Sequence, residues 1–158
     1  MKKTIFFVVL LTIVIIGSMI AVFLNARSPV NEKAEVALQR AQSETEIAST
    51  EDVSLYNGKN SYVVITGENT SGEKIIVWVP EKKEAEIIVK KWADGISKEA
   101  AINKLNDEND VNEILSVKLG MESVGPVWEL TYLDENEHLN YYYLLFETGE
   151  WWRKIENL

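Results

Sequence analysis

The chain has 158 residues, of which 46% are hydrophobic and 26% are charged, and its formal net charge is −9. Residues 1–28 hold three of the 16 basic residues and none of the 25 acidic ones, so the rest of the chain is strongly acidic. An acidic body argues against nucleic-acid binding by counterion release, which needs clustered Lys and Arg, so we expect no nucleic-acid partner. The absence of cysteine excludes disulfides and Cys-ligated metals, and the single histidine, His138, excludes any site built on two histidines.

The N-terminal segment is uncharged from Thr4 to Leu24 and is dominated by Ile, Val, Leu, Phe and Met. At about 1.5 Å of rise per residue, a helix of this length crosses the hydrocarbon core of a bilayer. A cleaved signal peptide is the alternative, but its apolar region usually has only about 7–15 residues. Because Lys2 and Lys3 precede the segment, the positive-inside rule places the N-terminus in the cytoplasm. We therefore predict a single-pass cell-membrane protein with a cytoplasmic stub and transmembrane anchor at 1–28 and an extracytoplasmic body.

The first part of the body has one helical pattern followed by alternating patterns. Ser28-Pro29 is predicted to end the anchor helix, and Asn31 is predicted to cap a new helix. Its apolar stripe has helical spacing at Ala34, Ala37, Leu38 and Ala41. After Ser49 the period becomes two, which is typical of strands. The predicted strands are 52–57, 61–66, 74–79 and 85–91, with a hairpin loop at 67–72.

The second part of the body repeats this order. Gly95 ends the fourth strand, and Ser97 is predicted to cap a helix that carries Ala101, Ile102 and Leu105. Predicted strands follow at 114–119, 127–133, 139–146 and 151–155. An offset of 66 residues places one half on the other, with Asn31 on Ser97. The sequence therefore predicts an α+β fold of two tandem units, 29–94 and 95–158, each with one helix and an antiparallel sheet.

Two of the predicted strands, 74–79 and 139–146, are apolar on both faces. Such strands are covered on both faces. The helix of the unit covers one face, and the other meets the sister unit, a partner or the curled sheet itself. The strand 127–133 differs, because Glu129 and Thr131 alternate with apolar residues and predict one side in contact with water.

No catalytic arrangement is visible in the sequence. There is no phosphate-binding Gly-rich loop, nucleophile elbow or zincin helix. The acidic run 107–110 lacks the spacing and the glycine of a calcium-binding EF-hand loop. His138 falls in a polar run, 134–138, that predicts a solvated hairpin loop. We expect no catalytic residue, no metal site and no cofactor, although the clustered carboxylates leave open glycan hydrolysis by two carboxyl groups.

The aromatic runs Tyr141-Tyr142-Tyr143 and Trp151-Trp152 are the most unusual feature of the body. Neighbouring strand residues face opposite sides, so each run divides between the core and another surface. Exposed aromatic residues are typical of contact surfaces. We name Tyr142, Trp151 and Trp152 as candidate partner-binding residues.

Several stretches together resemble the TseB/YpmB-type cell wall elongation regulators of Gram-positive bacteria. The residues that carry the resemblance are Tyr56-Asn57-Gly58 with Tyr62, Val77-Trp78-Val79-Pro80, Asp94-Gly95-Ile96-Ser97-Lys98-Glu99-Ala100, Pro126-Val127-Trp128-Glu129-Leu130-Thr131-Tyr132, Leu139-Asn140-Tyr141-Tyr142-Tyr143 with Phe146, and Gly149-Glu150-Trp151. The resemblance implies two tandem cystatin-like, PepSY-related units. It also implies an extracytoplasmic, non-enzymatic partner of a penicillin-binding transpeptidase, with no catalytic residues to transfer. We therefore expect a penicillin-binding protein or another membrane protein of wall synthesis as the partner.

A second function remains open at this point. Cystatin-like and PepSY units also occur as protease inhibitors, so the chain could instead inhibit an extracytoplasmic protease. That function needs an exposed wedge loop, for which the sequence offers 67–72 and 80–84.

Overall fold

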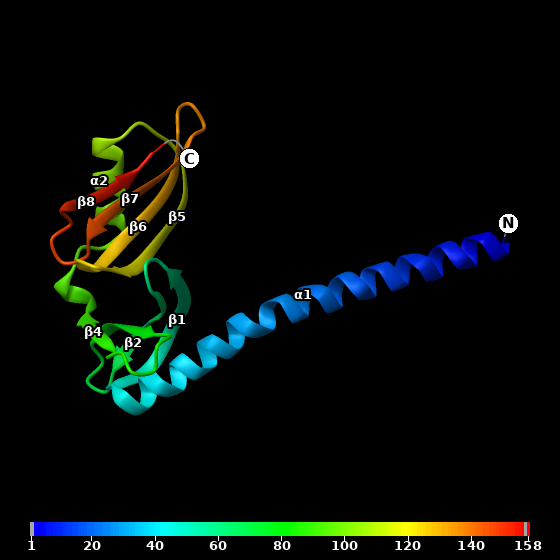
Figure 1. Cartoon of the computed structure of the whole chain (residues 1–158), viewed down its shortest axis with the longest axis horizontal. Helices are drawn as coiled ribbons and strands as arrows, with labels where there is room; N and C mark the ends of the chain where they lie inside the picture. Colours follow the sequence, from blue (N-terminus) through cyan, green and yellow to red (C-terminus); the bar gives the residue numbers. More distant parts are fainter. Residues whose placement is uncertain (1, 157) are drawn as a thin grey trace.

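The computed structural model describes the backbone of residues 2–156 and 158, and the side chains of residues 10–19, 31–156 and 158. It is an α+β structure with two four-stranded antiparallel sheets, ordered β1-β2-β3-β4 and β5-β6-β7-β8 (Figure 1). The elements in chain order are α1 (Lys2–Glu44), β1 (Ile47–Asn57), β2 (Ser61–Asn69), β3 (Lys74–Pro80), β4 (Ile88–Lys91), the short 3-10 helix η1 (Trp92–Asp94), α2 (Lys98–Glu108), β5 (Val111–Glu122), β6 (Gly125–Asp134), β7 (Leu139–Leu145) and β8 (Trp151–Ile155).

Helix α1 is a single helix of 43 residues, so the predicted break at Ser28-Pro29 is wrong. Asn31 accordingly lies inside the helix and is not its cap. A proline inside a helix removes one backbone hydrogen bond and can be accommodated by a local bend. The helix is held at its C-terminal end, where Ala37 and Ala41 are buried against the first sheet. Its N-terminal part extends away from both sheets (Figure 1).

The predicted membrane anchor, residues 4–24, falls largely on positions whose side chains lie outside the described part of the structure. Within the described part, no helix is long and apolar enough to cross a membrane. The anchor therefore stays a prediction.

The C-terminal end of α1 covers one face of the first sheet. Ala37 and Ala41 are 5% and 0% exposed, and these small side chains allow the helix to approach the strands closely. They pack on Ile47, Val63, Ile65, Ile75, Val77 and Val79. Arg40 fixes the helix to the chain between β3 and β4, because its guanidinium donates to the carbonyl oxygen of Ala85 at 2.7 Å. Strand β4 begins at Ile88 rather than at the predicted residue 85.

The other face of the first sheet packs against the second unit, in one core. Val64, Ile76 and Trp78 share this core with residues of the second sheet and of α2. The Trp78 and Phe146 rings meet edge to face, with centroids 6.1 Å apart. The prediction that strand 74–79 is covered on both faces is confirmed, and the cover on its second face is the sister unit.

Helix α2 begins where Ser97 predicts it. The Ser97 hydroxyl accepts a hydrogen bond from the backbone N–H of Ala100 at 3.1 Å, which satisfies a donor that the first turn leaves free. Ala101 and Leu105 are fully buried against the second sheet. The predicted second helix is therefore confirmed.

The polar side of β6 is less exposed than its alternation predicts. Thr131 is buried, with 8% of its surface exposed, and Glu129 is half-buried. The prediction of a side in contact with water is therefore wrong for Thr131. The sequence pattern identifies which residues share a face of a strand, but not which side chains from other strands cover that face.

Candidate functional site

The three candidate partner-binding residues occupy different environments. Tyr142 is only 2% exposed and lies in the shared core, where its hydroxyl donates to the Glu108 carboxylate of α2. Trp151 is 58% exposed on β8, at the edge of the second sheet. Trp152 is half-buried, and its ring meets Tyr143 edge to face with centroids 5.8 Å apart. Trp151 and part of Trp152 are therefore accessible to a partner, whereas Tyr142 is buried and can only stabilise the fold.

A register shift between β7 and β8 separates the two tryptophans. Trp151 pairs with Leu144 and Arg153 pairs with Tyr143, so Trp152 is an extra residue without a partner across the ladder. An extra residue of this kind locally bends a strand and redirects its side chains. Here it brings Trp152 against Tyr143 and leaves Trp151 in solvent.

A group of polar residues lies where the two units meet, and we call it the junction cluster: Tyr56, Glu122, Glu129 and Tyr143. The Tyr56 hydroxyl, from the end of β1, donates to Oε1 of Glu122 on β5 at 2.7 Å. The Tyr56 ring lies against Gly120, where a Cβ atom would come within 2.3 Å of the ring. Only a glycine at position 120 allows this approach.

Burial controls the proton affinities of the junction cluster. Burial and the hydrogen bond to Glu122 raise the pKa of Tyr56 far above its usual value. Burial and the negative charge of Glu129 likewise raise the pKa of Tyr143. Burial also raises the pKa of Glu129, against the opposing effects of its hydrogen bond to Tyr143 and the charge of Lys118. The two phenols are therefore protonated donors at neutral pH, and their arrangement suits positioning of the two units rather than proton abstraction.

The sequence prediction missed the junction cluster, although one signal pointed to it. Tyr56 and Glu122 stand 66 residues apart, the same offset that relates the two halves of the sequence. Equivalent strand ends, those of β1 and β5, thus meet at the junction. The offset identifies Tyr56 and Glu122 as equivalent positions of the two halves, but their contact appears only in the folded structure.

Asn109, in the acidic run 107–110, and His138 have local structural partners. Asn109 accepts a hydrogen bond from the Tyr132 hydroxyl at 3.3 Å, so the acidic run at the end of α2 is tied to the core. His138 lies in the β6–β7 loop, with its Nδ1 atom 3.3 Å from the Asp134 carboxylate. Within the described part of the chain, no three His, Cys, Asp or Glu side chains are close enough together to hold a metal ion.

The two candidate wedge loops differ from their prediction. Strand β2 continues to Asn69 and includes Gly67, so the loop that the sequence places at 67–72 is shortened to the turn after Asn69. The Asn69 side chain accepts hydrogen bonds from the N–H groups of Ser71 and Glu73 and fixes this turn. The segment 80–84 packs beside α1, where Lys33 forms an ion pair with Glu81 at 2.7 Å.

Comparison with known proteins places this architecture in a family. The model of the cell wall elongation regulator TseB-like domain matches residues 36–80, which cover the end of α1 and strands β1 to β3. The chain is 32% identical over 152 residues to the probable cell wall elongation regulator TseB of Bacillus subtilis (strain 168), covering 94% of both chains. The chain belongs to the TseB-like family.

A solved structure agrees with this membership. The YpmB protein from Bacillus subtilis superimposes with a TM-score of 0.73 and 34% sequence identity, over 77% of this chain and 95% of that one. The family model covers only the end of α1 and strands β1 to β3, whereas the TseB match extends over nearly the whole chain. The similarity therefore includes both sheets of this TseB-like chain.

Proposed function

We propose that this chain is a membrane-anchored, extracytoplasmic binding protein that regulates cell wall elongation through contact with a penicillin-binding transpeptidase. The observation that carries the proposal is the 32% identity, over 94% of both chains, to a protein named as a probable cell wall elongation regulator. The transpeptidase as target and the cystatin-like nature of both units extend the proposal beyond that name. They rest on the resemblance of the sequence to this family.

The anchor and the orientation are part of the proposal. On α1, the large apolar side chains at residues 10–19 are about half or more exposed, which is unfavourable in water and favourable in a bilayer. Lys2 and Lys3 favour a cytoplasmic N-terminus. A membrane anchor would also raise the effective concentration of the body near a membrane-bound partner.

A binding function agrees better with the site than a chemical one. The buried hydroxyls of Tyr56 and Tyr143 hold their protons, and the carboxylates nearest them are engaged in the same cluster. The exposed aromatic side chain at the edge of the second sheet, Trp151, suits contact with a protein.

A crosslinking experiment in intact membranes tests the proposal. A photo-crosslinking amino acid replaces Trp151 in the full-length chain, and the cells are treated with a fluorescent penicillin that labels transpeptidases covalently. We expect a penicillin-labelled band to shift in mass after illumination. The control places the same crosslinker at Leu115, which is 48% exposed on β5. We expect no shifted band from this position.

Two outcomes would count against the proposal. If no crosslinked product carries penicillin, a transpeptidase is not the partner at this surface. If the product is instead an extracytoplasmic protease, the inhibitor function would take precedence.

A further inference from the structure

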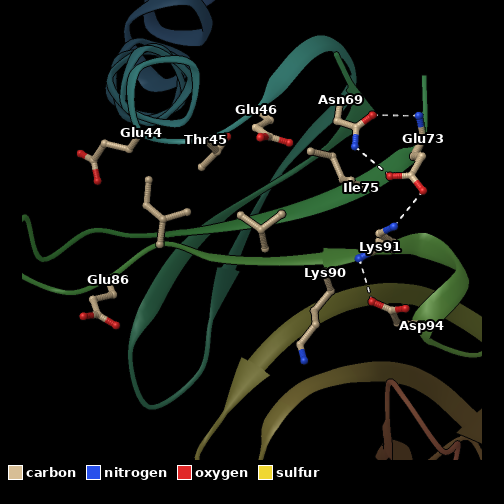
Figure 2. A pocket seen from close by; sticks show the side chains of 12 residues that line it. Glu44, Thr45, Glu46, Asn69, Glu73, Ile75, Glu86, Lys90, Lys91 and Asp94 are labelled. Atoms are coloured by element: carbon tan, nitrogen blue, oxygen red, sulfur yellow. Dashed lines mark hydrogen bonds and ion pairs between the residues drawn. The ribbon is translucent and has the colours of Figure 1, made fainter. Parts of the chain in front are cut away.

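A groove lies at the free edge of the first sheet, beyond the end of α1. The register pairs Val89 of β4 with Val77 of β3, so both side chains lie on the sheet face that α1 covers. Val77 is fully buried, but Val89 is 42% exposed, because the helix does not reach the last strand. The apolar face of the sheet therefore continues past its cover. Figure 2 shows this uncovered part of the face.

This edge groove has an apolar floor and an acidic rim. It has a volume of about 810 Å³, and its floor is formed by Ile75, Ile87 and Val89. Its charged lining residues are Glu44, Glu46, Glu73, Glu86, Lys90, Lys91 and Asp94, and its uncharged polar ones are Thr45 and Asn69. The lining thus carries five carboxylates and two ammonium groups, so the groove has a net negative charge.

Both lysines of the groove are already paired. Lys91 forms an ion pair with Glu73 at 2.8 Å, and Glu73 is also bonded to Asn69, so this network closes one end of the groove (Figure 2). Lys90 forms an ion pair with Glu147 of the second unit at 2.7 Å. Its charge is therefore directed away from the rim.

Two rim carboxylates remain unpaired. Among the described residues, the Glu46 and Glu86 side chains have no hydrogen-bond or ion-pair partner. They lie on opposite sides of the apolar floor (Figure 2). A ligand that complements this arrangement needs an aliphatic centre and positive charges on both sides of it.

We propose that the edge groove binds a basic polypeptide segment of a protein partner, with a branched aliphatic side chain on Ile87 and Val89 and Lys or Arg side chains at Glu46 and Glu86. Addition of a further strand to β4 is not the mode of binding. The strand has four residues and ends in two lysines, which are features that protect sheet edges. In addition, the Lys91 N–H is occupied by the Asp94 carboxylate at 3.1 Å. The proposal relies on the proposed function only in assuming a protein partner.

A peptide-binding measurement on the full-length chain in detergent tests the proposal. The probe is a fluorescent hexapeptide, Lys-Val-Lys-Leu-Lys-Val, followed by fluorescence anisotropy at low and high salt. We expect saturable binding that weakens as salt is raised. A peptide with serine at the aliphatic positions keeps the charge and should bind about tenfold more weakly.

Matched variants locate the binding to the groove. The double variant that carries Glu46→Gln and Glu86→Gln should bind the hexapeptide about three- to tenfold more weakly than the wild type. The control, Glu135→Gln with Glu137→Gln, removes the same charge from the exposed β6–β7 loop and should leave binding unchanged. Val89→Ser, at a partly exposed position, should weaken binding to a similar extent without unfolding the chain.

Several outcomes would overturn the proposal. Equal loss in the rim and loop variants would mean that net charge alone attracts the peptide. Equal binding of the serine peptide would mean that the apolar floor is not used. Absence of peptide binding, together with self-association that Val89→Ser abolishes, would assign the groove to a second copy of the chain. The peptide measurements do not depend on the crosslink from Trp151. Failure of the groove proposal can therefore be distinguished from failure of the proposed function.

Discussion

At the scale of single residues, the contacts between the two units depend on close approach and on buried polar groups. The Tyr56 ring fits over Gly120, and its hydroxyl reaches Glu122 at 2.7 Å. Glu129 lies beside these groups and is half-buried, so its charged form is disfavoured. The junction cluster therefore links the position of one unit on the other to the protonation of one carboxyl group.

Replacement of this carboxyl group should change how stability depends on pH. Burial raises the pKa of Glu129 in the folded chain above its ordinary value of 4.5, so its contribution to stability is present below that value and is lost as the pH rises through the raised folded pKa. Glu129→Gln does not undergo this loss. Urea unfolding of the full-length chain should show Glu129→Gln gaining stability relative to the wild type as the pH is raised above the ordinary pKa of a glutamate. Glu135→Gln is the control for removal of one charge from an exposed loop, and a flat difference for Glu129→Gln would contradict the prediction.

Gly95, between the units, offers a second test at the residue scale. A Cβ atom at this position would come within 2.4 Å of the Phe146 ring. Gly95→Ala should therefore destabilise the fold by about 1–3 kcal/mol through overpacking. In a double-mutant cycle, Phe146→Leu should make room for the added methyl group, so that the double variant loses less than the sum of the two single losses. Additive losses would mean that the ring does not limit the size of residue 95.

At the scale of elements, strand β3 connects both parts of the structure. Its Ile75, Val77 and Val79 side chains pack under α1, and its Ile76 and Trp78 side chains pack on the second unit. Trp78 is fully buried, and among the described residues its indole Nε1 has no hydrogen-bond acceptor. Trp78 therefore stabilises the fold through packing rather than through hydrogen bonding.

Truncation of this side chain should be costly. Trp78→Ala should lower the free energy of unfolding by about 3–5 kcal/mol, because a large buried side chain is replaced by a cavity. His138→Ala, in the exposed β6–β7 loop, should lower it by about 0.5 kcal/mol or less. Urea titration followed by tryptophan fluorescence measures both changes. Similar small losses for the two variants would show that Trp78 does not join the units.

Some helices and strands could be predicted from the sequence alone, and others could not. The positions of β2, β3, α2 and β8 follow from alternation and from the Ser97 cap, because these signals are local. The continuity of α1 past Pro29 cannot be predicted from these local signals, because a proline disfavours a helix without preventing it. Likewise, the cover over Thr131 and the burial of Tyr142 depend on strands distant in sequence, and alternation cannot reveal them.

At the scale of the whole molecule, the two sheets form one body rather than two independent beads. Their shared core includes Trp78 from the first sheet, Phe146 and Trp128 from the second part of the chain, and Leu105 from α2. Each half alone would be near the lower size limit for a stable core. A chain built in this way holds its exposed edge residue, Trp151, and its acidic edge groove in a fixed relation to each other.

The most direct test of the proposed function is the rate of cell elongation in the organism that encodes this chain. The gene is deleted, and the lengthening of single growing cells is followed by microscopy. We expect the elongation rate to change on deletion and to return to its original value when the full-length chain is supplied again. An elongation rate that is the same with and without the chain would contradict the account.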